Sequence, residues 1–100
     1  MKISIIIPVY LSEAYIGSCI DSIFHQECNE ADIECIIVDD CSEDRSMEII
    51  ASKLNEYHGK IQFIMIRHEV NRGHCAARNT ALAEAKGDYV MFVDSDDCII

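Results

Sequence analysis

The chain has 100 residues, half of them hydrophobic, and its 18 acidic and 8 basic side chains give a formal net charge of −10. This length fits one domain or part of one, the apolar fraction excludes a disordered chain, and the negative charge opposes binding to nucleic acid. Because no apolar run reaches the roughly 18 residues that span a bilayer, and no cleavage site follows Met1–Val9, we expect a cytoplasmic protein with no membrane contact encoded in this segment, or the cytosolic part of a larger one.

Four short apolar runs rich in β-branched residues predict buried strands, and the periodic or small-residue segments between them predict helices. In chain order, we expect a strand over Ile3–Val9, a helix capped by Ser12 that fades by about Glu27, a strand over Ile33–Val38, a helix carrying Met47–Tyr57 that ends at Gly59, a strand over Ile61–Ile66, a helix over His74–Lys86 and a strand over Tyr89–Val93. This alternation is typical of an α/β fold with an open parallel sheet of about four strands and helices on both faces. With no helix after the last strand, we interpret residues 1–100 as the truncated N-terminal part of a longer domain.

Six cysteines would suit a small secreted protein with disulfides if they lay in loops. Cys19 and Cys75 instead fall in predicted helices, Cys35 falls in a predicted strand, and there is no CxxC pair. We therefore favour free thiols over disulfides.

Polar side chains gather where the predicted strands end, which is the edge at which open α/β sheets bind ligands. The strand ends carry, in chain order, Pro8–Tyr10, Asp39 and Asp40, Arg67 and His68 with Asn71 and Arg72, and Asp94–Asp97. Clustered carboxylates repel one another, so this edge predicts a bound cation. Oxygen ligands favour Mg²⁺ or Mn²⁺, which commonly bind together with phosphates, and we interpret the edge as a site for a nucleotide diphosphate.

Histidines do not contribute to this expected metal site. His25, His58, His68 and His74 share no face of the predicted elements, and we assign them surface or capping positions. A dinucleotide site of the Rossmann type is not supported either, because the turn after the first strand lacks GxGxxG and no Walker lysine motif occurs. The acidic turn after the last strand is the remaining candidate for holding phosphates.

Four segments resemble the family 2 glycosyltransferases of the GT-A fold, which are inverting enzymes that use nucleotide-diphosphate sugars. They are SIIIPVY at Ser4–Tyr10, IIVDDCSEDRS at Ile36–Ser46, NRGHCAARN at Asn71–Asn79 and GDYVMFVDSDD at Gly87–Asp97. The resemblance covers the whole chain. It implies a metal-dependent transferase of polysaccharide biosynthesis that moves a sugar, with a leaning to UDP-sugars, onto an acceptor hydroxyl.

The resemblance also implies roles at the nucleoside end of the site. Pro8, Val9 and Tyr10 would line the nucleoside pocket, and Glu13 would lie near the ribose. Asp40, with Asp39 beside it, would accept a hydrogen bond from the imide N–H of the base. Leu11 and Cys41 stand where the family commonly has asparagine and glycine, so the two turns around them depart from its pattern.

At the phosphate end, the resemblance implies a DxD motif. Asp94 would lie near the ribose, and Asp96 would bind the metal that bridges the phosphates, with Ser95 or Asp97 in support and Asp94 as the second candidate ligand. Arg78 would brace this end by pairing with the aspartates or touching the nucleotide, and Arg72 is a further candidate.

The catalytic part is expected outside this segment. In such enzymes the general base is usually an aspartate beyond the DxD strand, which here would follow Ile100. We therefore expect residues 1–100 to hold donor and metal only, to bind nucleotide poorly, to transfer no sugar and to form a homo-oligomer through the truncated sheet edge. Two alternatives are a nucleotide-binding module without catalysis and a receiver-like signalling domain, although a receiver needs an aspartate where Arg67 and His68 stand.

Overall fold

The structure is a computed structural model that describes residues 2–25 and 32–94. Its elements are β1 (Ile3–Val9), α1 (Ile16–Phe24), β2 (Ile33–Asp39), α2 (Ser46–Glu56), β3 (Gln62–Arg67), α3 (His74–Glu84) and β4 (Tyr89–Phe92). The expected alternation of strands and helices is confirmed. Most boundaries lie within two residues of the predicted ones.

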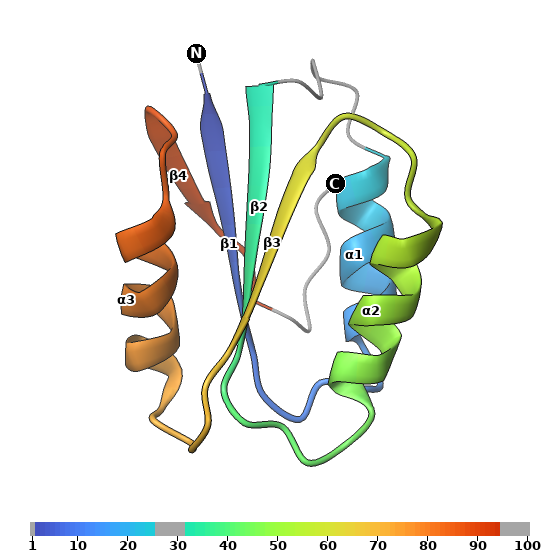
Figure 1. Ribbon diagram of the computed structural model, residues 1–100, viewed down its shortest axis with the longest axis vertical. Helices are drawn as coiled ribbons and strands as arrows, with labels where there is room; N and C mark the ends of the chain where they lie inside the picture. The colour runs from blue at the N-terminus through green and yellow to red at the C-terminus, as the bar shows by residue number, and fades with distance from the viewer. Residues whose placement is uncertain (1, 26–31, 95–100) are drawn as a thin grey trace.

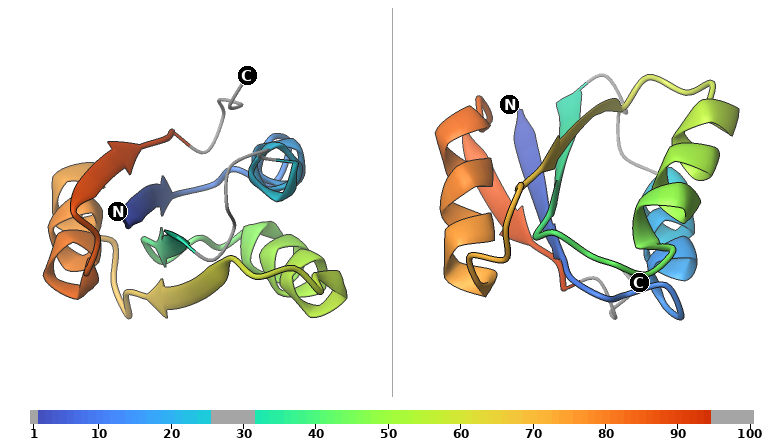
Figure 2. Two further views of the ribbon diagram at one scale, coloured as in Figure 1. Left: turned by 90° about the horizontal axis from the view of Figure 1, so that it is seen from above. Right: turned by 60° about the horizontal axis from the view of Figure 1, so that its bottom comes forward.

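The four strands form one parallel sheet in the order β3-β2-β1-β4. α3 covers one face of the sheet, and α1 and α2 lie side by side on the other (Figure 1). Seen from above, β3 and β4 are the two edges and β1 and β2 are central (Figure 2). The α/β class with an open parallel sheet and helices on both faces is confirmed.

Apolar side chains fill both spaces between sheet and helices. On the α1 and α2 side, the buried core draws on β1, β2 and α1. On the α3 side it is thinner, with Ile6, Ile36 and Val38 packed against Ala77 and Ala81. Small residues on α3 let the helix lie close to the sheet, which brings its N-terminus up to the carboxyl ends of β1 and β2.

The start of α1 differs from the prediction. The helix begins at Ile16 and has no side-chain cap, because Tyr15 occupies the N-cap position. Ser12 instead starts a turn in which its carbonyl oxygen accepts hydrogen bonds from the backbone N–H of Tyr15 and Ile16, at 2.9 and 2.8 Å. The backbone N–H of Ser12 donates to Ser46 Oγ at 2.8 Å, which ties this turn to the start of α2. The expected end of the helix near Glu27 lies outside the described residues.

A buried carboxylate fixes the amino ends of the strands, opposite the ligand edge. Glu34 of β2 has a side chain only 1% exposed, and its Oε2 accepts hydrogen bonds from Ser4 Oγ at 2.5 Å and from the backbone N–H of Lys86 at 2.6 Å. The backbone N–H of Gly87 donates to the same Ser4 hydroxyl at 2.9 Å. This network joins β1, β2 and the segment that leads into β4.

Two further sequence expectations concern the cysteines and the membrane. The four cysteines that the structure describes, Cys19, Cys35, Cys41 and Cys75, are free, as expected, while Cys28 and Cys98 lie outside the described residues. No helix among residues 2–25 and 32–94 combines the length and apolar character needed to cross a membrane.

Candidate functional site

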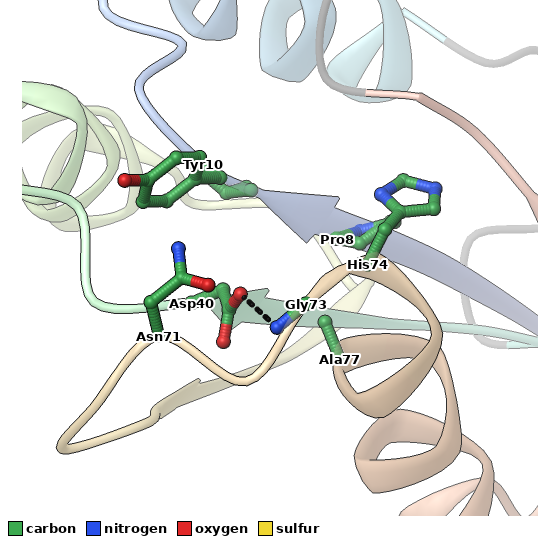
Figure 3. Close-up of a pocket in the computed structure, with 8 residues that line it drawn as sticks. Pro8, Tyr10, Asp40, Asn71, Gly73, His74 and Ala77 are labelled. Atoms are coloured by element: carbon green, nitrogen blue, oxygen red, sulfur yellow. Dashed lines mark hydrogen bonds between the residues drawn. The ribbon is translucent and has the colours of Figure 1, made fainter.

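A cavity of about 380 Å³ opens at the carboxyl ends of β1 and β2. The end of β1, the residue after β2 and the start of α3 enclose it (Figure 3). Its lining consists of Pro8, Val9, Tyr10, Asp40, Asn71, Gly73, His74 and Ala77. The cavity therefore lies at the sheet edge where the sequence predicts ligand binding.

Asp40 is the buried carboxylate of this cavity, with a side chain 4% exposed. Its Oδ1 accepts hydrogen bonds from the backbone N–H of Arg72 at 2.9 Å and from His68 Nδ1 at 2.7 Å, and its Oδ2 accepts one from the backbone N–H of Gly73 at 2.8 Å. Burial alone would raise the pKa of Asp40, but these hydrogen bonds and the nearby imidazole outweigh burial and lower the pKa below its usual 3.8. Asp40 is thus held as an anion at neutral pH.

His68 is buried between this carboxylate and α3. Its Nδ1 faces Asp40 Oδ1, and its Nε2 lies 2.8 Å from Thr80 Oγ1. The Thr80 hydroxyl also lies 3.0 Å from the carbonyl oxygen of Ala76, one turn earlier in α3. The expectation of a surface or capping position is wrong for His68, whose side chain is only 5% exposed.

Asp39 does not join Asp40 in the cavity. Its Oδ2 accepts a hydrogen bond from the backbone N–H of Ser42 at 3.0 Å and lies 3.5 Å from Arg67 Nε. Its Oδ1 is buried and has no hydrogen-bond partner among the described residues. The two neighbouring aspartates therefore have different surroundings. Asp39 holds the turn after β2, and Asp40 lines the cavity.

Basic groups of α3 gather around Asp94, the last described residue. Asp94 Oδ1 lies 3.5 Å from Arg78 Nη2 and 3.6 Å from His74 Nε2, and its side chain is 49% exposed. The Arg78 guanidinium also lies over the ring of Phe92, 5.2 Å from the ring centre. The Asp94 carboxylate is thus half-exposed, and it lies beside His74, which lines the cavity.

The expected metal ligands are only partly described. Asp94 is an exposed carboxylate of the kind that hard divalent ions prefer, whereas Ser95 and Asp96 lie outside the described residues. Within residues 2–25 and 32–94, no group of three or more His, Cys, Asp or Glu side chains could hold a metal ion. The donor chemistry of Asp94 fits the expected ion, and the second ligand would have to come from the residues after it.

The structure brings some of the predicted site residues together and separates others. Pro8, Val9, Tyr10 and Asp40 line the cavity. Five others do not line it: Glu13, Asp39, Arg72, Arg78 and Asp94. The backbone N–H of Glu13 is bonded to Asp44 Oδ2 at 3.2 Å, and the backbone N–H of Arg72 is bonded to Asp40 Oδ1.

The sequence places His68 and Asn71 at the ligand edge without indicating a role for them, and it does not indicate Gly73, His74 or Ala77 as site residues. The glycine in NRGHCAARN is a signal for the loop before α3, because Gly73 has a φ of 97° that few other residues adopt. For His68, the register of the sheet is the signal. Asp39 pairs with Arg67 across β2 and β3, so the residues that follow them are neighbours.

The fold and the cavity define an α/β protein with an open parallel sheet, whose cavity lies at the carboxyl ends of the strands, where proteins of this class bind their ligands. A sequence profile described as "Glycosyl transferase family 2" matches residues 4–100. The chain belongs to this family of glycosyltransferases, and its fold is the GT-A fold of the structural neighbours.

Among the relatives is the poly(ribitol-phosphate) beta-glucosyltransferase of Bacillus spizizenii, 48% identical over 99% of this chain and 15% of the relative. TarS of Staphylococcus aureus, a poly(ribitol-phosphate) beta-N-acetylglucosaminyltransferase, is 39% identical over 99% of this chain and 17% of its own. The chain thus spans about a sixth of the length of these relatives.

Solved structures agree with this assignment. The crystal structure of S. aureus TarS 1-349 in complex with UDP has a TM-score of 0.88 and 39% identity, over 99% of this chain and 28% of that one. The mannosyltransferase PcManGT of Pyrobaculum calidifontis in complex with GDP-Man and Mn²⁺ has a TM-score of 0.89 and 27% identity, over 97% of this chain and 28% of that one.

Proposed function

We propose that residues 1–100 are the donor-binding part of an inverting, metal-dependent glycosyltransferase that uses a UDP-sugar. The observation that carries this proposal is the Asp40 carboxylate, held as an anion at the wall of a cavity at the ligand edge of the sheet. The relatives are named as glycosyltransferases, and neighbouring structures contain UDP, UDP-GlcNAc or GDP-Man.

The nucleoside would enter the cavity between β1 and the start of α3. Pro8, Val9 and Tyr10 would form the apolar wall, and the half-exposed Tyr10 ring is free to pack on a base. Asp40 would accept a hydrogen bond from the base. A ring N–H suits this anion, whereas a ring nitrogen lone pair would be repelled, so uracil fits this position better than cytosine.

The diphosphate would lie toward the end of β4. Asp94 and Asp96 would hold Mn²⁺ or Mg²⁺ with Ser95 in support, and a bound ion at this position offsets the negative charge of the leaving diphosphate. Arg78 would brace Asp94, to which its Nη2 is already paired at 3.5 Å. Arg72, exposed beside the cavity, and Glu13 remain candidates for contacts to the donor, and Asp39 would act only through the turn that it holds.

The transfer itself needs a second part of the enzyme. An acceptor hydroxyl oxygen would attack the anomeric carbon as the bond from that carbon to the diphosphate oxygen breaks, which inverts the configuration, and a general base would take the hydroxyl proton. We propose that this base and the acceptor site lie beyond Ile100, and that residues 1–100 alone bind the donor nucleotide poorly and transfer no sugar. We also propose that the enzyme works in the cytoplasm and takes part in polysaccharide biosynthesis. Residues 1–100 alone would form a homo-oligomer through the β4 edge of the sheet.

A thermal-shift and calorimetric comparison of UDP, GDP, CDP and dTDP, each with Mn²⁺ and with a chelator, tests the proposal. UDP with Mn²⁺ should stabilise the chain most, because the ion and the diphosphate compensate each other's charge. Equal UDP affinity with Mn²⁺ and with chelator would contradict the metal assignment. A chain stabilised by no nucleotide under either condition would contradict donor binding and favour a signalling or structural role.

A further inference from the structure

Asp40, His68 and Thr80 form a chain of buried polar groups that runs from the cavity wall to the middle of α3. His68 lies at the centre, with its two ring nitrogens 2.7 Å from Asp40 Oδ1 and 2.8 Å from Thr80 Oγ1. Each link comes from a different element: the end of β2, the end of β3 and α3. Such a chain fixes the ring of His68 in one orientation.

The protonation of this chain follows from the charge of Asp40. An ionised carboxylate only accepts hydrogen bonds, so His68 Nδ1 must carry the proton and donate it to Asp40 Oδ1. The Thr80 hydroxyl has one proton, which it donates either to a bare Nε2 or to the carbonyl oxygen of Ala76, and in the second case its oxygen accepts from a protonated Nε2. Asp40 therefore selects the tautomer of His68, and Thr80 holds the ring plane.

The same hydrogen bonds limit what Asp40 can still accept. An ionised carboxylate offers about four acceptor positions. Among the described residues, three hydrogen bonds reach Asp40: two arrive at Oδ1, from His68 and Arg72, and one arrives at Oδ2, from Gly73. Oδ2 thus keeps one acceptor position, on the carboxylate that lines the cavity (Figure 3).

We infer that His68, held by Thr80, is a positioning residue that fixes Asp40 so that its remaining acceptor position selects a nucleobase with a ring N–H. This inference rests on the proposed function, in which Asp40 meets the base. Without the His68 hydrogen bond, only the backbone N–H groups of Arg72 and Gly73 hold the carboxylate, one at each oxygen, and its plane is fixed less firmly. The remaining acceptor position is then less well directed, so the site distinguishes uracil from cytosine less well.

Two amide variants distinguish the two hydrogen bonds of the His68 ring, because each variant can keep only one of them. In His68→Asn, the side-chain amide nitrogen lies near the place of Nδ1 and can still donate to Asp40. In His68→Gln, the longer side chain puts its amide near the place of Nε2, where it reaches Thr80 instead. Both variants lose one hydrogen bond of a buried pair, so a purely structural role for His68 predicts similar behaviour for both.

The test is the ratio of the dissociation constants of CDP and UDP, measured by calorimetry with Mn²⁺ on the wild-type chain and the variants. We expect His68→Asn to keep most of the wild-type preference for UDP, and His68→Gln to lose about tenfold or more of it, as for a lost hydrogen bond to a charged group. Thr80→Val should reduce the preference, and Thr80→Ser should restore it. Ser4→Ala, at the opposite end of the sheet, is the control for lost stability alone.

A spectroscopic readout needs no ligand. In ¹H–¹⁵N spectra of the imidazole groups, His68 should show a protonated Nδ1 with slow exchange, and this signal should persist in Thr80→Ser. A wild-type chain with no preference for UDP would overturn the proposed function and the inference with it. A wild-type preference that His68→Gln retains in full, or a His68 ring protonated only at Nε2, would overturn the inference alone.

Discussion

Gly73→Ala should damage both the fold and the site through the backbone alone. Gly73 is the N-cap residue of α3, with φ 97° and ψ 164°, a combination that is almost restricted to glycine. A Cβ added there would meet no atom within 4 Å, so side-chain crowding contributes nothing. The cost is therefore backbone strain, about 1–3 kcal/mol of the free energy of unfolding.

The same change should weaken nucleotide binding. If the backbone at residue 73 rotates to relieve strain, the Gly73 N–H leaves Asp40 Oδ2, to which it is bonded at 2.8 Å, and the neighbouring Arg72 N–H moves as well. Urea unfolding followed by circular dichroism measures the first effect, and calorimetric titration with UDP and Mn²⁺ measures the second. We expect a lower midpoint of unfolding and a weaker affinity in the same variant.

Two other glycines provide matched controls. At Gly87, an added Cβ would lie 2.5 Å from Ser4 Oγ and 2.7 Å from the Ser4 backbone nitrogen, so Gly87→Ala should lose about 1–3 kcal/mol by crowding, far from the cavity. At Gly17 in α1 the nearest contacts are an ordinary 3.6 Å, and Gly17→Ala should gain up to about 1 kcal/mol. Unchanged stability in Gly73→Ala, or an equal loss of UDP affinity in Gly87→Ala, would refute the reasoning.

Three further predictions concern Glu34, the thiols and Asp96. Burial alone would raise the pKa of Glu34, but hydrogen bonds from Ser4 and Lys86 outweigh burial and lower the pKa below its usual 4.5. The contribution of ionised Glu34 to the stability of the fold is therefore complete above about pH 4.5, and it is lost as the pH falls through the lower pKa of the folded chain. Glu34→Gln should cost about 1–3 kcal/mol at pH 7 and flatten the acid limb of a stability–pH curve, and an unchanged acid limb would contradict this. Burial and the nearby Cys19 raise the pKa of the Cys35 thiol, so Cys35 should resist an aromatic disulfide reagent in the native chain, while all six thiols should react after denaturation without reductant, and fewer than six would indicate a disulfide. Asp96→Asn should weaken Mn²⁺-dependent UDP binding without lowering the melting temperature of the metal-free chain, because one charge leaves a repelling cluster, and a large drop would mark Asp96 as structural.

The strands were predictable because buried parallel strands have a simple signature. Ile3–Val9 is apolar nearly throughout, and the structure places its ends where the sequence does. Two strands, β2 and β3, each extend one residue further than their apolar runs, to Asp39 and Arg67, while β4 ends one residue earlier than predicted, at Phe92. These charged residues read as loop in the sequence, yet they pair across the two strands and continue the ladder.

The helix start and the site depend on contacts that local patterns do not contain. Ser12 has the right chemistry for a helix cap, but its backbone is held by Ser46 from α2, 34 residues away, and the helix begins later. His68 appeared to be one of four scattered histidines. Its role arises only when the sheet register places it beside Asp40 and the packing of α3 supplies Thr80.

The strand order also favours one order of strand pairing during folding, in which β1 pairs with β2 before it pairs with β4. β1 meets β2 across a separation of 30 residues, from Ile3 to Ile33, but it meets β4 across 86, from Ile3 to Tyr89. Closing the longer loop costs about 1 kcal/mol more in chain entropy, and on a ribosome it waits until residue 89 has emerged. The wall that carries Asp40 needs only β1, β2, β3 and the start of α3. The wall that carries Asp40 can therefore form before the part of the chain that carries Asp94, and the two can be gained or lost in separate steps of folding.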